Sequence, residues 1–410
     1  MSTDYNSPLN RETFNSKTSL EFFAGIGLMR MGLNSAGWNI IFANDIDADK
    51  KKMYLDHFTE SSEEFLLGDV HKLDPAIVPR ATLATASFPC NDLSLAGARK
   101  GLSGKNSSAF WGFIKVIEGM KDRRPPLVLL ENVSGFLTSN KGQDIEEALI
   151  ALNKLDYFVD ALMIDASHFV PQSRVRLFII GINKNATDSG SKVNDNISFY
   201  ESDVRQKALA NFIFSHPNIE WKLRELPKLP TLKYYLDSII DAPEIENSEW
   251  WPEERANYLI NQMQPLHKKK LDQMKIDQKW TFATAFRRVR NGKTVAEIRN
   301  DGIAGCLRTP RGGSARQILI KAGFGEVFIR LLSPTECARL MGADNFKINV
   351  TLNQALFGFG DAVAVPVIQW IAENYLNPIL DEMNNIDVNK GAFQRPLIFE
   401  TAKFTLPKTA

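Results

Sequence analysis

The chain has few of the residues that build disulfide frameworks or metal clusters. Its 410 residues include 3 cysteines and 5 histidines, and no two cysteines stand in a paired spacing. This usage excludes a disulfide-stapled secreted domain and a cysteine-rich zinc site. The histidines also lack the spacing of metal ligands, so we expect no bound metal. The sequence indicates a protein of a reducing compartment.

Long apolar runs are lacking as well. No stretch reads as apolar enough to span a membrane, and the N-terminus does not have the pattern of a signal peptide. We therefore expect a cytoplasmic protein with no membrane partner. The length suits two domains, each with room for a core of its own.

A strong excess of one charge is the third absence. The formal net charge is +1, which excludes a general attraction to polyanions. The charge is nevertheless uneven, because residues 265–330 hold 15 lysines and arginines against 5 aspartates and glutamates. Such a basic segment is typical of a phosphate-binding surface. A merely solvated face remains an alternative for the lysine run 268–270.

The sequence does contain a series of apolar runs that end in glycine or polar residues. Five of them read as buried strands, and a helix begins near Met29 after the first; the runs are 18–23, 38–43, 64–67, 81–86 and 127–130. The carboxyl ends of parallel strands share one edge of an open α/β sheet, and ligands bind there. The pattern predicts a doubly wound sheet with a ligand site at that edge.

The residues at the first three strand ends suit a nucleotide-like ligand. Gly25 and Gly27 let the backbone approach a ligand closely, next to the N-terminus of a helix. Asp45 follows Gly25 by 20 residues, a distance that suits hydrogen bonding to ribose hydroxyls. Asp69 could accept from an exocyclic amine of adenine, with Val70 against the ring. Each acidic residue alone could equally be a helix cap or a turn residue.

The later strand ends carry reactive groups. Cys90 follows the fourth strand and Glu131 the fifth. Arg174 and Arg176 alternate before an apolar run and would share one face of a strand. The alternatives are an inert buried thiol for Cys90 and a surface ion-pair ladder for the arginines.

Six motifs in this order resemble those of prokaryotic and phage DNA (cytosine-5)-methyltransferases. They are Glu21–Gly27, Pro89-Cys90, Glu131–Val133, Gln172–Arg176, Arg330–Gly342 and Phe357–Val363. The resemblance covers residues 18 to about 185 and about 330 to 375. The chain departs from the family pattern at several positions. Asn91 replaces the usual Gln, Asp361 the usual Asn, and Cys306-Leu307 the frequent Thr-Leu.

The resemblance implies a Rossmann-like methyltransferase. Its methyl donor would be S-adenosyl-L-methionine, and its cofactor product would be S-adenosyl-L-homocysteine. Cys90 would add to C6 of a flipped-out cytosine, and Glu131 would act as general acid at N3. Arg174 and Arg176 would donate to the cytosine O2 and to the loop after Cys90. The cofactor would contact Phe23, Gly25, Gly27, Asp45, Ile46, Asp69, Val70, Pro89, Asp361 and Val363.

The resemblance also implies an inserted target-recognition domain for double-stranded DNA. We expect a catalytic part at 1–185, the insert at 186–344, a returning catalytic part at 345–385 that completes the sheet, and a tail at 386–410. A hairpin around Asn291-Gly292 is expected in the insert. The DNA contacts would be Ser94, Arg287, Arg288, Arg308, Arg311, Gly312, Gly313, Arg316 and Gln317.

Three other functions fit the sequence less well. A tRNA cytosine-5 methyltransferase on the same scaffold would carry a Cys-Phe-Thr signature, which this chain lacks. A nucleic-acid-binding module without catalysis does not fit the intact set of Cys90, Glu131, Arg174 and Arg176. An amino-methylating enzyme would need an Asp/Asn/Ser-Pro-Pro-Tyr motif. We expect a monomer acting at the nucleoid, either an orphan methylase or one paired functionally, but not physically, with a restriction endonuclease.

Overall fold

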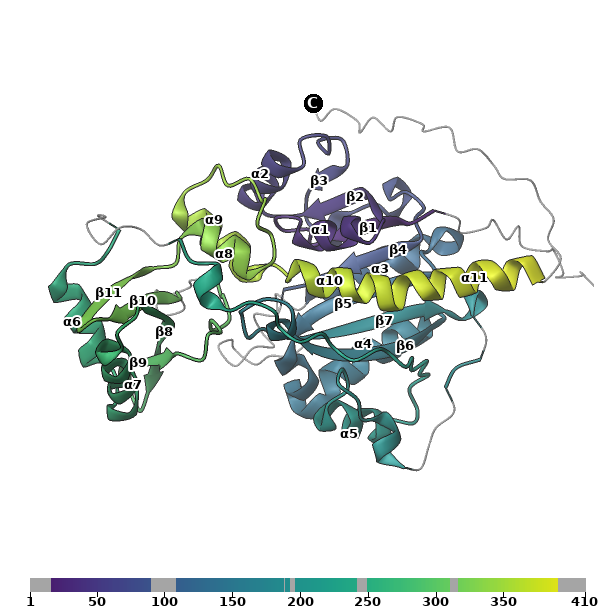
Figure 1. Cartoon of the computed structure of the whole chain (residues 1–410). Coiled ribbons are helices and arrows are strands. Elements are labelled where there is room, and N and C mark those ends of the chain that lie inside the picture. The colour runs from purple at the N-terminus through teal and green to yellow at the C-terminus, as the bar shows by residue number, and fades with distance from the viewer. Residues whose placement is uncertain are drawn as a thin grey trace, which may run out of the picture.

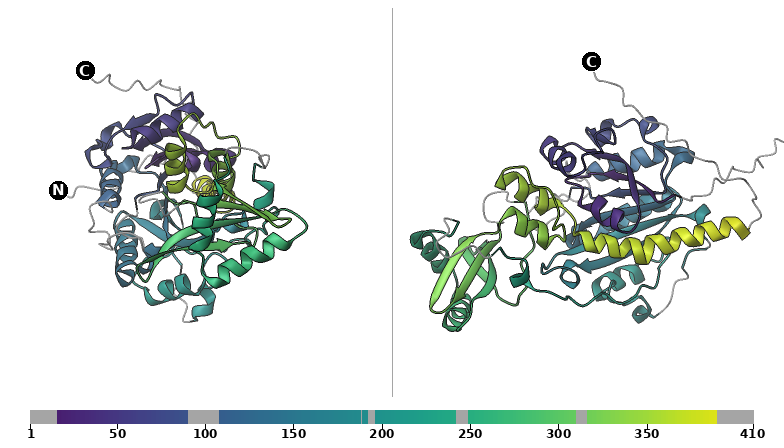
Figure 2. Two further views of the ribbon diagram at one scale, coloured as in Figure 1. Left: turned by 90° about the vertical axis from the view of Figure 1, so that its left-hand side faces the viewer. Right: turned by 45° about the horizontal axis from the view of Figure 1, so that its top comes forward.

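The polypeptide builds two sheets of different size. The computed structural model describes residues 16–89, 108–187, 189–191, 196–241, 249–309 and 316–389. A seven-stranded sheet forms the larger part, and a four-stranded sheet lies at one end of the molecule (Figure 1). The views in Figure 2 place helices α8 (Pro334–Leu340) and α9 (Leu352–Asp361) between the two sheets.

The large sheet confirms the predicted doubly wound architecture. Its order is β3-β2-β1-β4-β5-β7-β6, and the five strands before β7 are parallel. The order reverses between β1 and β4, which creates a crevice at the carboxyl ends of these strands. The bounds are β1 Thr18–Phe22, β2 Asn39–Asp45, β3 Phe65–Leu67, β4 Leu83–Ala86, β5 Leu127–Val133, β6 Tyr157–Asp165 and β7 Val175–Asn183.

Alternation along the strands explains why both faces of the sheet are covered. In β5, Leu127 and Leu129 belong to one core with α1, α10 and α11, whereas Val128 and Leu130 belong to a second core with α3, α4 and α5. Successive side chains of a strand point to opposite faces, so an all-apolar strand needs helices on both. The helices are α1 Leu28–Ser35, α2 Ala48–His57, α3 Ser108–Gly119, α4 Gln143–Lys154, α5 Lys207–Ser215, α10 Val365–Ile371 and α11 Asn377–Asn389.

The returning part of the chain is helical, so the expectation that it completes the sheet is wrong. After a capping box of Thr351 and Gln354, helices α9, α10 and α11 follow, and the last two run across one face of the sheet (Figure 1). Gly32 of α1 permits close contact with α10, since a Cβ there would lie 2.6 Å from Cβ of Ile368. The apolar residues of this segment therefore complete a helical layer.

The segment Leu352–Asn385 passes a test of length and hydropathy for crossing a membrane, which the sequence analysis did not expect. Of its most apolar window, 67% is buried inside the fold. Packing against the sheet accounts for these apolar side chains, so the segment is weak evidence for a membrane span.

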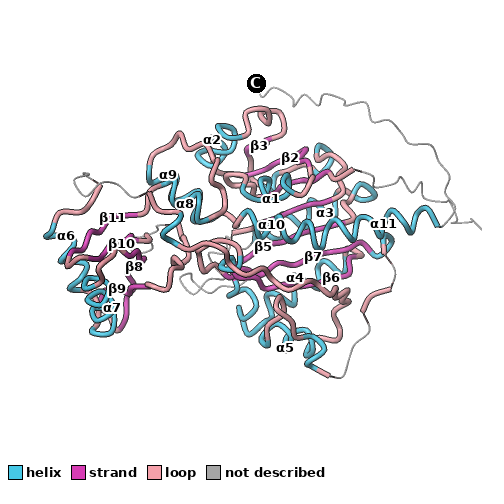
Figure 3. The backbone as a smooth tube through the Cα atoms, in the orientation of Figure 1, coloured by secondary structure: helices cyan, strands magenta, loops and turns pink. Residues whose placement is uncertain are grey.

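The four-stranded sheet has a core of its own. Its order is β11-β10-β8-β9, and Figure 3 shows its strands grouped apart from those of the large sheet. The predicted hairpin is confirmed, because Asn291 and Gly292 have φ of 49° and 75° between paired strands. The elements are α6 Glu253–Asn261, α7 Pro265–Ile276, β8 Thr281–Arg290, β9 Lys293–Arg299, β10 Ile318–Gly323 and β11 Glu326–Leu331.

The expected start of the insert at residue 186 is too early. Helix α5 and Trp221 belong to the core on the large sheet, and the backbone N–H of Val159 in β6 donates to Glu220 O at 3.0 Å. At the other end, Leu340 of α8 belongs to the first core of the large sheet. The separate small core draws its residues from 251 to 331. Residues 249–331 therefore contain the inserted unit, and Trp250, Ala304, Leu307 and Leu319 within this range pack into the first core of the large sheet.

Candidate active site

The strand ends named in the sequence lie along one edge of the large sheet. Phe22 of β1 pairs with Asn44 of β2 and with Ala86 of β4, and Ala86 pairs with Leu130 of β5. Strand β7 runs antiparallel to β5, so its first residues reach the same edge. This edge, from the end of β3 to the start of β7, is called the catalytic rim below.

The glycine loop after β1 is shaped around Asp45. The N–H of Gly25 donates to Oδ2 of Asp45 at 2.8 Å, and the N–H of Asp47 donates to Oδ1 at 2.9 Å. Phe23, Gly25 and Gly27 have φ of 56°, 58° and 85°, so the backbone turns sharply under the rim. Burial raises the pKa of Asp45, and Lys50 opposes the shift. A carboxylate has about four acceptor positions, so Asp45 keeps capacity for a further donor.

Other residues of the expected cofactor site have mixed surroundings. Ile46 is an exposed isoleucine, with 69% of its surface accessible, directly beside Asp45. The Asp69 carboxylate accepts from the N–H of His71 at 3.0 Å. Asp69 therefore caps the short helix that follows it, which was one alternative for this residue. Val70 and Val363 are buried, whereas Pro89 is exposed.

Glu131 and Arg176 form a buried pair on neighbouring strands. Nε of Arg176 lies 3.0 Å from Oε1 of Glu131, and Glu131 is only 6% exposed. Arg176 of β7 pairs with Val133 of β5, and Glu131 lies two residues before Val133. Glu131 and Arg176 therefore lie on the same face of the sheet. Burial raises the pKa of Glu131, although the Arg176 and Arg174 guanidiniums pull it down. Such an environment favours a carboxyl group that can hold a proton.

Arg174 is held by backbone carbonyl groups of distant segments. Its guanidinium donates to Leu307 O at 2.8 Å, to Gly360 O at 3.2 Å and to Ala362 O. It is 2% exposed and thus joins two distant segments beneath the rim. Its buried Nε has no hydrogen-bond partner among the described residues, so the expectation that Arg174 donates to a bound base remains a prediction. The two arginines do share a side of the strand, since both approach Cys306 Sγ.

Cys306 is a site residue that the sequence analysis did not single out. Its Sγ lies 3.3 Å from Nη1 of Arg174 and 4.0 Å from Nη2 of Arg176. Burial alone would raise the pKa of the thiol, but Arg174, Arg176 and Arg308 outweigh it and lower the pKa. The signal available in the sequence was the departure from Thr-Leu at Cys306-Leu307. The contact itself spans more than 130 residues, which no local pattern reveals.

The approach to the expected nucleophile is held from β5. The Nδ2 group of Asn132 donates to Phe88 O at 3.2 Å, and the Phe88 ring is buried. The chain entering Pro89 is thereby fixed beside Glu131. Cys90 itself and Ser94 lie outside the described residues.

The comparisons with known proteins agree with this geometry. The family model described as C-5 cytosine-specific DNA methylase matches residues 18–377. The chain belongs to this family. Among its relatives, the Type II methyltransferase M.HhaI of Haemophilus parahaemolyticus is 26% identical over 360 residues, which is 87% of this chain and 93% of the relative. M.DsaV of Dactylococcopsis salina, also a Type II methyltransferase, is 28% identical over 88% of this chain and 86% of its own.

Solved structures support the fold of this C-5 cytosine-specific DNA methylase. The S. pombe Dnmt2 methyltransferase has a TM-score of 0.56 and 19% identity, with coverage of 90% of this chain and 99% of the other. The protein is therefore a DNA (cytosine-5-)-methyltransferase of a family that uses S-adenosyl-L-methionine.

The expected DNA contacts of the methylase have different surroundings. Arg308 is exposed, and Arg287 lies half-buried in β8. Arg288 and Arg316 have protein partners, because Nε of Arg288 lies 3.3 Å from Glu297 and Nη2 of Arg316 donates to Asn353 at 2.7 Å. Gln317 is 8% exposed and donates to Cys306 O at 3.3 Å, and its expected contact with DNA remains a prediction. Arg311, Gly312 and Gly313 lie outside the described residues.

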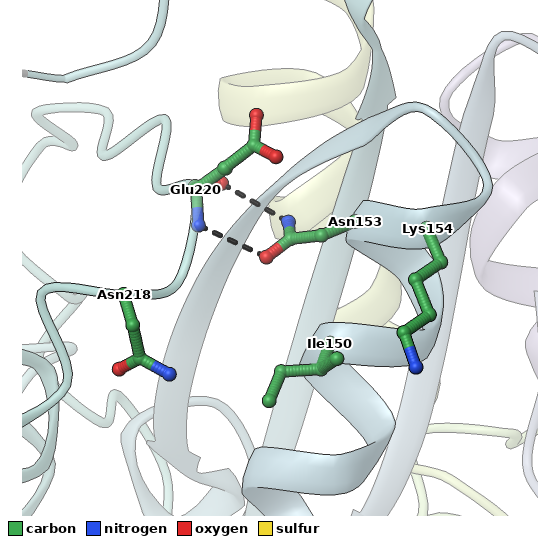
Figure 4. Close-up of a pocket in the computed structure, with 5 residues that line it drawn as sticks. All are labelled: Ile150, Asn153, Lys154, Asn218 and Glu220. Atoms are coloured by element: carbon green, nitrogen blue, oxygen red, sulfur yellow. Dashed lines mark hydrogen bonds between the residues drawn. The ribbon is translucent and has the colours of Figure 1, made fainter.

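One surface depression lies away from the catalytic rim. It is lined by Ile150, Asn153, Lys154, Asn218 and Glu220 (Figure 4). The Asn153 amide accepts from the N–H of Glu220 at 2.9 Å and donates to its C=O at 3.3 Å. Tyr157, which follows this helix, pairs with Asn183 at the far end of β7 from Arg176. The depression therefore lies at the end of the sheet opposite the catalytic rim. The Asn153 amide anchors the loop that contains Glu220.

Proposed function

We propose that this methylase transfers a methyl group to C5 of a flipped-out cytosine in a specific duplex DNA sequence, through a covalent bond between Cys90 and C6. The observation that supports this most is the buried Glu131–Arg176 pair at 3.0 Å, next to the strand end that leads into Pro89-Cys90. A proton donor and a fixed cation beside a thiol are what the reaction needs.

The chemistry follows from the weakness of cytosine C5 as a nucleophile. Addition of the Cys90 thiolate to C6 moves an electron pair toward N3, where Glu131 supplies a proton, and C5 becomes enamine-like. Arg176 holds Glu131 in place and places positive charge near the thiolate and the ring. When bound, S-adenosyl-L-methionine supplies an electrophilic methyl group for C5. A water held in the site takes the C5 proton, the Cys90 thiolate leaves C6, and N3 returns its proton to Glu131, which restores the enzyme.

The residues around Asp45 fit this cofactor. Helix α1 begins at Leu28, and its N-cap Gly27 provides no side-chain cap. The Arg30 N–H of the first turn donates to Glu21, so the N–H groups of Leu28 and Met29 are those that would meet an anionic group of the cofactor. Asp45 retains acceptor capacity for ribose hydroxyls, and exposed Ile46 offers an apolar surface for a ring. We assign the nucleoside to Asp45, Ile46, Asp69 and Val70, and the methionine part to the loop from Phe23 to Gly27.

Duplex DNA would bind between the catalytic rim and the inserted unit. A base within a duplex cannot reach the buried Glu131, so the cytosine must leave the stack at a cost of a few kcal/mol. The basic surplus of residues 265–330 lies on the inserted unit and would meet the phosphates. The curated relatives are Type II methyltransferases, so we propose a modification enzyme of a restriction-modification system or an orphan methylase acting at the nucleoid.

A variant of the nucleophile tests the proposal. Cys90→Ala should abolish methyl transfer yet bind duplex DNA, since affinity comes mainly from phosphates. Sequencing of host DNA for 5-methylcytosine first identifies the target site, and a duplex with 5-fluorocytosine at that site should trap the wild type covalently. A stable adduct formed by Cys90→Ala would overturn the assignment. Methyl incorporation into total tRNA, but not into duplex DNA, would instead favour the tRNA alternative.

A further inference from the structure

Three segments far apart in the sequence meet at Asp361, at the end of α9. Its Oδ2 accepts from Nζ of Lys50 in α2 at 2.8 Å, and its Oδ1 accepts from the hydroxyl of Thr309. The carboxylates of Asp361, Asp45 and Asp47 together raise the pKa of Lys50, although burial alone would lower it. Lys50 is therefore a cation at neutral pH. The three residues Lys50, Asp361 and Thr309 are called the rim bridge below.

The backbone before Thr309 is pressed directly onto α9. A Cβ added to Gly360 would lie 2.5 Å from the Thr309 nitrogen and 2.6 Å from the Arg308 carbonyl carbon. Arg174 binds the carbonyl oxygens of Leu307 and Gly360 at 2.8 and 3.2 Å from below. The segment 307–309 therefore has a fixed position relative to α9.

The same helix receives the chain again beyond residue 315. Nη2 of Arg316 donates to Oδ1 of Asn353, at the first turn of α9, at 2.7 Å. The chain on both sides of residues 310–315 is thus attached to one helix, at opposite ends. Arg311, one of the expected DNA contacts, belongs to this stretch, which lies outside the described residues. Residues 309–316 are called the DNA-reading segment below.

Helix α9 also contacts the glycine loop of the cofactor site. A Cβ at Gly358 would lie 2.8 Å from Cγ2 of Ile26, between Gly25 and Gly27, and 3.1 Å from Met53 of α2. Gln354 donates to Asp49 of α2 at 3.2 Å. Any movement of α9 therefore displaces both the cofactor loop and the anchors of the DNA-reading segment.

We propose that Lys50, Asp361 and Thr309 are positioning residues that couple the DNA-reading segment to the cofactor loop, so that each ligand strengthens binding of the other. The inference rests on the proposed function. The bridge needs α2, α9 and residue 309 in register at once. A ligand that fixes one of these segments favours the register that the other ligand requires. Such coupling is reciprocal and commonly amounts to about 5–150-fold.

The test measures the Kd of S-adenosyl-L-homocysteine with and without the duplex that carries the mapped target site. In the wild type, the duplex should tighten binding by about 10-fold, within the usual range of such coupling. Thr309→Val and Lys50→Met should reduce this ratio to within about twofold of unity. Thr309→Ser, which keeps a hydroxyl, should retain it. Lys52→Met is the matched control, because Lys52 pairs with Asp56 on α2 and should leave the ratio unchanged.

The outcomes separate the bridge from a merely structural role. If Thr309 had only a structural role, Thr309→Val would change the melting temperature, or both Kd values in proportion, and leave their ratio intact. That result would overturn the proposal. An unchanged ratio in that variant, a wild-type ratio within twofold of unity, or a lost ratio in Lys52→Met would each sink it. Absence of S-adenosyl-L-homocysteine binding or of methyl transfer in the wild type would instead contradict the proposed function.

Discussion

Individual residues at the catalytic rim act through neighbours that lie far away in the sequence. Asp361 stands where the family usually has asparagine, and its added charge is met by Lys50, 311 residues earlier. The Cys306 thiol similarly lies close to Arg174, which directly precedes β7, and to Arg176, the second residue of β7. A single replacement at such a position therefore changes the charge balance of a whole site.

Glu131 permits a prediction at this scale. Glu131→Gln keeps the shape of the side chain but removes the proton that we assign to N3, so turnover should fall by about 10²-fold or more. Because the acid form is the active one and burial raises the pKa of Glu131, wild-type turnover should decline as pH rises through that pKa. Single-turnover rates across pH would measure both effects. A variant rate within about threefold of wild type would contradict the general-acid role.

The residues could be predicted where chemistry and local pattern coincide. Gly25, Asp45 and Glu131 were found because each follows an apolar run, and the register of β1, β2, β4 and β5 aligns those ends. The role of Arg174 could not be predicted in this way. Its alternation with Arg176 gave the correct side of the strand, but its carbonyl partners at 307, 360 and 362 depend on how α9 packs.

At the scale of elements, β1 carries a buried carboxyl group beneath the glycine loop. Glu21 is 1% exposed and accepts from the Arg30 N–H and the Tyr54 hydroxyl, both at 3.2 Å. Burial raises its pKa to about 8, although Arg30 opposes the shift. The folded protein thus holds this proton where the unfolded chain would lose it near pH 4.5. The neutral form stabilises the fold at low pH, and that contribution is lost as pH rises.

Glu21→Gln should therefore become more stable relative to the wild type as pH rises from about 4.5 to about 8, with no further gain above. The full difference is at most roughly 5 kcal/mol. Urea denaturation at several pH values measures it, with exposed Glu63→Gln as a control. A difference that stays constant across this pH window would show that Glu21 titrates normally.

The returning helices show why element type was harder to predict than element position. The resemblance placed residues 345–385 with the catalytic part, and their apolar residues do pack on the large sheet, but a buried helix and a buried strand are both apolar on their packed sides. The capping box at Thr351 decides for a helix, and the large sheet already has β3 and β6 at its edges. The tail after residue 389 lies outside the described residues.

At the scale of the molecule, the inserted unit is compact enough to be exchanged. Its core is formed by residues 251–331, which includes Leu259 of α6, so the basic segment 265–330 alone would leave part of the core behind. Exchange of residues 249–331 with the equivalent unit of a methylase of other specificity should transfer target choice. Methylome sequencing of the host reads the result. A folded, active chimera that keeps the original target would exclude the unit as reader.

The packing of α1 against α10 has a consequence for synthesis of the protein. A Cβ on Gly32 would touch Ile368, and Nε1 of Trp38 donates to Oδ1 of Asn377 at 2.8 Å. The first helix therefore meets its partner only after more than 330 further residues have left the ribosome. Until then α1 covers that face of the nascent sheet without α10 and α11, while the inserted unit can already close its own core. The core between the sheet, α1 and α10 is accordingly completed only when the last part of residues 18–377 has been synthesised.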